Sequence, residues 1–81
     1  MVRMDGAETR KERIVEVARI VMSLLFENKD AGWITLSKSV KIIMSKTGLT
    51  RPKVMEYLDL KEAEGAFELD ETNDKIKSVA V

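Results

Sequence analysis

The side chains whose types and spacing could carry chemistry are cations in the middle of the chain and carboxylates near its end. Thr50, Arg51 and Lys53 follow Thr47-Gly48-Leu49, a sequence typical of a turn that starts a new helix. The amino end of a helix attracts phosphate, and an arginine there can pair with guanine through two hydrogen bonds. Three lysines precede this turn, namely Lys38, Lys41 and Lys46. The pattern favours contact with a polyanion.

The residues of the sequence give little support for catalysis or metal binding. The chain contains no cysteine and no histidine, which removes disulfides, the commonest zinc ligands and the commonest general base. Asp70, Glu71 and Asp74 cluster, but they lie in a turn sequence, and Lys75 stands where a calcium loop requires glycine. No glycine-rich phosphate loop is present. We therefore expect no enzymatic activity, no cofactor and no metal.

The charge of the chain is polarised along the sequence. Residues 1–29 carry a net +1, residues 30–53 carry +4 and residues 54–81 carry −5, and the total is zero. A surface that faces phosphates must therefore lie in the middle third. With 81 residues, 44% hydrophobic and 35% charged, the composition suits one soluble folded domain.

The sequence also bears on location. No apolar run approaches the roughly 18 residues that span a membrane, and the start of the chain lacks the apolar stretch of a secretory signal. We expect a cytoplasmic protein without a membrane partner. Glutamine is absent while Lys, Arg and Glu are abundant, which is the direction in which heat-adapted proteins drift.

The first predicted element is a long helix. Residues 1–7 have no periodicity and are expected to form a flexible arm, so that the domain covers residues 8–81. The helix should run from about Glu8 or Thr9 to Asn28, and Thr9 with Glu12 fits a capping box. One helical face gathers apolar residues: Ile14, Val17, Ala18, Val21, Leu24 and Leu25.

Three more apolar residues, Val15, Met22 and Phe26, widen this face to an arc of about 200°, more than a one-sided surface helix needs. Two interpretations stay open. The helix is either central and covered by several neighbours, or the three residues form the interface of a homodimer.

After a turn at residues 28–32, short elements follow. Trp33–Thr35 is a candidate strand that would join a later hairpin. Two amphipathic helices are expected at Leu36–Lys46 and Thr50–Glu64, with Thr35 or Ser37 capping the first and Thr50 the second. Strands are expected at 66–70 and 75–81. The predicted core residues of the two helices are Leu36, Val40, Ile43, Met44, Val54, Tyr57 and Leu58. Ile42 points away as a solitary exposed residue or an interface contact.

The chain resembles a winged helix-turn-helix domain over residues 8–81, which implies an α+β, mainly helical fold of three helices, a short strand and a C-terminal β-hairpin wing. The resemblance depends on Ile34-Thr35-Leu36, Thr47-Gly48-Leu49-Thr50, Val54 with Leu58, Gly65 and the strand around Phe67 to Leu69. Small winged-helix regulators of archaea and their viruses share this layout. In that family the third helix lies in the major groove and the wing touches the flanking backbone or minor groove.

Two features depart from the family pattern. Lys61 occupies a position that usually holds leucine, so either its aliphatic stem covers the core or Leu60 replaces it. The wing tip at residues 70–74 is acidic where a DNA-contacting wing offers Lys or Arg. Because carboxylates repel phosphates, this wing is not expected to enter a groove.

The resemblance and the charge pattern together predict a transcription regulator that binds double-stranded DNA as a homodimer. Arg51 and Lys53 would contact the bases, with Thr50 assisting. Lys38, Lys41 and Lys46 would neutralise phosphates. The alternative is a protein-interaction module of a replication or transcription assembly, with a partner at the acidic wing and little affinity for DNA.

Overall fold

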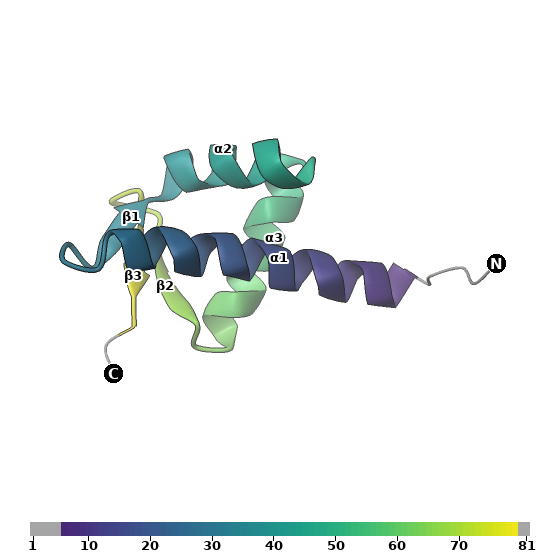
Figure 1. Cartoon of the computed structure of the whole chain (residues 1–81), viewed down its shortest axis with the longest axis horizontal. Coiled ribbons are helices and arrows are strands. Elements are labelled where there is room, and N and C mark those ends of the chain that lie inside the picture. The colour runs from purple at the N-terminus through teal and green to yellow at the C-terminus, as the bar shows by residue number, and fades with distance from the viewer. Residues whose placement is uncertain (1–5, 80–81) are drawn as a thin grey trace.

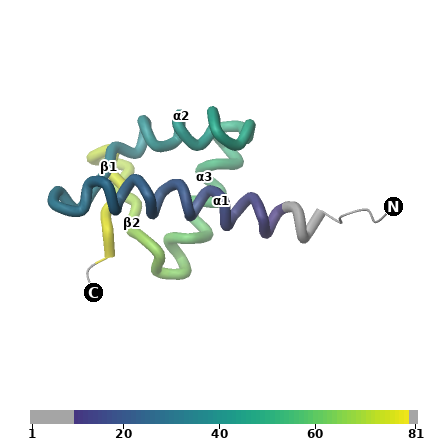
Figure 2. Tube along the Cα trace, in the orientation of Figure 1, coloured from purple at the N-terminus to yellow at the C-terminus, as the bar shows by residue number. Residues whose placement is uncertain are grey.

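The protein folds as three helices and one small antiparallel sheet, an α+β, mainly helical architecture as expected. The computed structural model describes residues 6–79 (Figures 1 and 2). The elements in chain order are α1 (Gly6–Glu27), β1 (Trp33–Thr35), α2 (Leu36–Thr47), α3 (Arg51–Ala63), β2 (Phe67–Asp70) and β3 (Lys75–Ser78). Within these residues, no helix combines the length and apolar character needed to cross a bilayer.

Helix α1 begins earlier than the sequence suggested. It starts at Gly6, so the helical backbone already includes Thr9, and the predicted capping box is wrong because Thr9 does not precede the helix. Residues 6 and 7, which were predicted to belong to the flexible arm, are therefore helical. Residues 1–5 lie outside the described part of the chain. The carboxyl end of α1 lies at Glu27, one residue before the predicted end at Asn28, and a turn follows.

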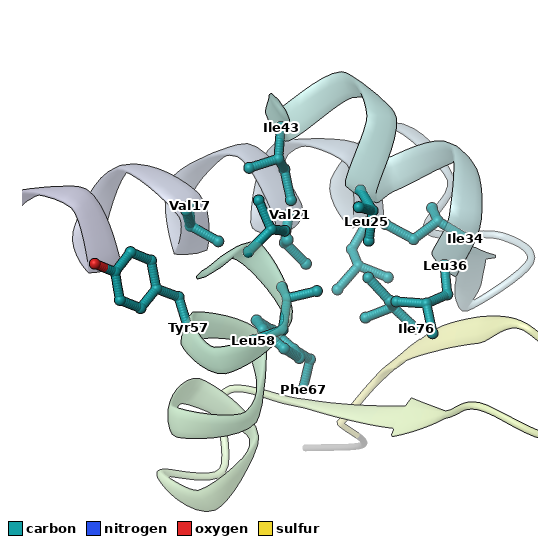
Figure 3. Close-up of a cluster of buried hydrophobic side chains, with 12 residues drawn as sticks. Val17, Val21, Leu25, Ile34, Leu36, Ile43, Tyr57, Leu58, Phe67 and Ile76 are labelled. Carbon is teal, nitrogen blue, oxygen red and sulfur yellow. The ribbon is translucent and has the colours of Figure 1, made fainter. Parts of the chain in front are cut away.

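The core lies where α1 crosses the other two helices and one face of the sheet (Figure 3). Val17, Val21 and Leu25 recur at four-residue steps on α1 and are almost fully buried, which confirms the predicted core face. Leu36, Val40, Ile43, Val54, Tyr57 and Leu58 are buried on α2 and α3 as expected, and Phe67 and Ile76 supply the sheet side. Figure 3 shows labelled side chains of this core, among them Val21, Leu58 and Phe67, gathered between the helices and the sheet.

The sheet has the order β1-β3-β2, so the last strand in the sequence is the central one. Ile76 on β3 pairs with Ile34 on one side and with Leu69 on the other. The prediction that residues 33–35 add to a later hairpin is confirmed. The second hairpin strand ends at Ser78, before the predicted end, and residues 80 and 81 of the predicted range lie outside the described part of the chain.

The turn between α2 and α3 follows the sequence signals. Gly48 adopts φ 75°, and its N–H donates to the Met44 carbonyl at 2.9 Å, which ends α2. Leu49 packs against the core after the turn. Thr50 and Thr35 do occupy the cap positions of α3 and α2, but neither side chain makes a capping hydrogen bond.

Asp74, in the turn between β2 and β3, caps α2 instead. Its carboxylate Oδ1 accepts hydrogen bonds from the Ser37 N–H at 2.9 Å and the Ser37 hydroxyl at 2.7 Å. Its carbonyl accepts from the Leu36 N–H at 2.9 Å. Asp74 adopts φ 56°, a conformation that Asp tolerates better than most residues. The first two amides of α2 are thus satisfied by a residue 37 positions away from Ser37.

The side chain of Lys61 is largely buried, which agrees with the first of the two alternatives. Its side chain is 20% exposed and its ammonium lies 3.1 Å from the Glu64 carboxylate at the surface. Leu60 is 37% exposed and does not replace it. The aliphatic stem of Lys61 therefore fills the position at which the resemblance implied leucine.

Candidate nucleic-acid interface

The six predicted DNA-contacting residues all lie at the surface, but they do not form one continuous row. Thr50, Arg51 and Lys53 are exposed together at the amino end of α3. Lys38 borders a hollow between α1, β1 and α2, beside Trp33 and Ile42. Lys46 borders another hollow between α1 and α2, near Arg19 and Glu27. Lys41 is exposed on α2.

Most of these cations have no internal partner. Within residues 10–79, no carboxylate lies in ion-pair distance of Lys38, Lys41, Lys46 or Arg51. Lys53 is the exception, because its ammonium lies 3.2 Å from Glu56 and 5.9 Å from the centre of the Tyr57 ring. The cations without a partner are available for an external anion.

Arg10 and Arg13 of α1 extend this surface. The sequence indicates a basic patch at the start of the first predicted helix that contains both, although neither is one of the six predicted contact residues. Arg10 lies 3.5 Å from the Glu56 carboxylate, and Arg13 donates to the Thr47 carbonyl at 3.3 Å. Their spacing from Val17 on the core face, seven and four residues, could have placed them next to the turn between α2 and α3. Figure 1 shows this end of α1 passing α3 near the end of α2.

The amino ends of α2 and α3 differ in what they offer an anion. At α2, the Asp74 carboxylate and carbonyl occupy the first amides. At α3, Thr50 gives no side-chain cap, and Pro52 in the first turn has no N–H to satisfy. The positive end of the α3 dipole and the exposed Arg51 are therefore both accessible to an anion.

The side of α3 that faces the hairpin has the opposite charge. A hollow between α3 and the β2–β3 turn is lined by Asp59, Glu62, Leu69, Asp70, Glu71 and Thr72. Further along the helix, Glu56 and Glu64 are also exposed. A phosphate backbone that approached this hollow would be repelled, so the positive surface is confined to the first turn of α3, to α2 and to the adjacent arginines of α1.

Several charges of the sheet are engaged internally. Asp70 Oδ2 lies 3.2 Å from the Lys77 ammonium, and both carboxylate oxygens accept hydrogen bonds from Asn73. The hydrogen bonds from Asn73, and then the nearby Lys77, lower the pKa of Asp70 from its ordinary value. The Lys75 ammonium lies 4.2 Å from the centre of the Trp33 ring. The two lysines of β3 therefore make contacts within the sheet and are less available to an external anion than the cations of α2.

Comparisons with known proteins do not assign a family. No protein-family model matches the chain, and neither the curated proteins nor the solved structures contain a match. The site must accordingly be interpreted from its own geometry.

Proposed function

We propose that this chain is a winged-helix-like domain that binds double-stranded DNA and acts as a transcription regulator. The layout supports this proposal. Two helices, α2 and α3, are joined by a short turn at Gly48, and a hairpin follows α3. This arrangement is the usual scaffold for presenting the second helix to DNA.

The observation that carries the proposal is the set of unpartnered cations at the amino end of α3 and on α2. Arg51, Lys38, Lys41 and Lys46 are exposed without an ion-pair partner within residues 10–79, whereas Asp70 and Asp74 are engaged elsewhere. Cations that are held on rigid helices, and that break no internal ion pair when they bind, are suited to neutralising phosphates.

The acidic side of α3 limits how deeply the helix can enter a groove. Asp59 and Glu56 are exposed on the later turns of the helix. We therefore assign base contact to Arg51, with Lys53 and Thr50 beside it, and backbone contact to the lysines of α2. Such a surface gives modest sequence preference and strong dependence on salt.

The first experiment is a titration of a labelled duplex followed by fluorescence anisotropy at low and moderate salt. Three phosphate contacts, one for each lysine of α2, would lower the affinity about 40-fold for a fourfold rise in salt. Arg51→Ala should reduce the preference for a selected site, while Lys41→Ala should weaken all duplexes alike.

Lys77→Ala is the matched control, because it removes one cation from the sheet rather than from α2 or α3. It should leave the affinity close to that of the parent protein. An absence of binding at low salt, or equal losses in Lys77→Ala and Lys41→Ala, would contradict the proposal.

The second candidate is a protein-interaction module that captures a basic partner in the carboxylate-lined hollow between α3 and the hairpin. Its test must spare Asp70 and Asp74, which stabilise the hairpin turn and the start of α2. The suitable variant is Asp59→Lys with Glu71→Lys, because both side chains are exposed. If this variant binds a poly-lysine peptide as well as the parent does, the acidic hollow is not a docking site.

A further inference from the structure

Helix α1 presents an outer apolar stripe that the other described residues, up to Val79, leave uncovered. Val15 is 46% exposed, Met22 is 48% exposed and Phe26 is 71% exposed. Figure 1 shows α1 on the near side of the molecule, with no other helix or strand of the described chain in front of it. Helix α1 is therefore not covered on this side by the described residues, as it would be if it were a central helix.

Charged residues continue the same stripe with a regular spacing. The sequence Glu12, Val15, Arg19, Met22, Phe26 and Lys29 alternates steps of three and four residues, the spacing of a helix that packs along another helix. Lys29, just after the helix, lies on this side because its ammonium is 5.1 Å from the centre of the Phe26 ring. The stripe is thus acidic at one end and basic at the other.

We propose that the stripe binds a second copy of this chain, with the two α1 helices antiparallel. In the pairing that sets Val15 against Phe26 of the second copy, Arg19 lies against Met22 and Glu12 lies against Lys29. One alignment therefore brings Val15 against Phe26 twice and forms both symmetry-related pairs of opposite charge, Glu12 with Lys29. The stem of Arg19 covers Met22 of the second copy, and its guanidinium reaches solvent.

The shape of the surface around Val15 fits this alignment. Lys11, Glu12, Glu16 and Arg19 border a hollow that has Val15 in its lining. Phe26, the most exposed large apolar side chain of the stripe, lies opposite this hollow in the antiparallel alignment. Four residues that surround a side chain from a facing helix are the usual packing of paired helices.

A parallel pairing is disfavoured by the same charges. It would set Glu12 against Glu12, Arg19 against Arg19 and Lys29 against Lys29 of the second copy. Within residues 10–79, Glu12 and Lys29 have no ion-pair partner, so the antiparallel pairing breaks no existing ion pair. Like charges across a helix interface select against that partner orientation.

The proposal goes beyond DNA binding and does not depend on it. Sedimentation equilibrium over a concentration series should show a monomer–dimer equilibrium for the parent protein. Glu12→Lys and Lys29→Glu should each weaken dimerisation about tenfold, because symmetry removes two exposed pairs. The double variant Glu12→Lys with Lys29→Glu should restore it. A monomer at every concentration, or no restoration in the double variant, would overturn the proposal.

The absence of native cysteine permits a direct test of the alignment. A mixture of Val15→Cys and Phe26→Cys proteins should form an intermolecular disulfide, and one native contact between Phe26 and Val15 remains in that dimer. Each variant alone should cross-link little, since eleven residues separate like positions, about 16 Å along the helix. Efficient cross-linking of Val15→Cys alone would show a parallel pairing and refute the antiparallel one.

Discussion

The carboxylates of the β2–β3 turn and the cations of α2 and α3 are equally prominent in the sequence, but the fold uses them differently. Asp70 bonds to Lys77 and Asn73, and Asp74 bonds to Ser37. Lys41 and Arg51, by contrast, are exposed without an ion-pair partner in the described residues. A cluster of charge is therefore a candidate binding surface only where the fold leaves the charge unengaged.

The largest expected effect is at Asp74. Asp74→Ala removes the acceptor for two hydrogen bonds from Ser37 and leaves only the carbonyl of residue 74 to bond the start of α2. We expect a loss of about 1–2 kcal/mol in the free energy of unfolding, measured by urea denaturation. Asp74→Asn keeps an acceptor and tolerates the positive φ, so its loss should be smaller. Parent-like stability of Asp74→Ala would show that the turn does not stabilise α2.

An intermediate effect is expected at Asp70, where the pKa is lowered first by Asn73 and then by Lys77. A lowered folded-state pKa stabilises the fold above the ordinary value of 3.8 and loses that contribution as the pH falls through the folded-state pKa. Asp70→Asn should therefore be less stable than the parent near neutral pH, and the difference should shrink in acid. Thermal unfolding against pH measures this.

Asn73→Ala serves as the comparison, because it removes the largest cause of the shift. In the Asn73→Ala background, the stability difference caused by Asp70→Asn should depend less on pH than it does in the parent. A constant difference between the parent and Asp70→Asn from neutral to acid pH would argue against an engaged Asp70 carboxylate.

The smallest effect is expected at the cations of α2. Lys41→Ala should change the free energy of unfolding by less than about 0.5 kcal/mol, because the side chain is exposed and makes no ion pair within residues 10–79. The same variant should weaken binding to duplex DNA. Chemical denaturation and DNA titration on one preparation separate these outcomes. A substantial loss of stability would place Lys41 in the fold rather than at a binding surface.

Local patterns were sufficient for most elements of the fold. The four-residue spacing of Val17, Val21 and Leu25 predicted the buried face of α1, and Gly48 predicted the end of α2. The alternation around Ile76 predicted a strand with one buried face. These predictions succeed because helical and strand periods are set by the backbone and do not depend on distant residues.

Helix ends were predicted less well. Thr9 and Thr50 were expected to cap α1 and α3 through the hydroxyl, and Thr35 or Ser37 to cap α2. However, α1 begins before Thr9, and neither Thr35 nor Thr50 makes a capping bond. The cap of α2 comes from Asp74, which the sequence placed in an acidic loop. A helix end accepts whichever acceptor the fold brings near, so its partner depends on tertiary contacts.

The sequence by itself determined the element order, the core faces and the concentration of positive charge between residues 30 and 53. Only the tertiary structure decided which charges remain available, because that depends on contacts between residues far apart in the chain. It engaged Asp74 with α2, placed Arg10 and Arg13 beside the turn before α3, and left Val15, Met22 and Phe26 uncovered.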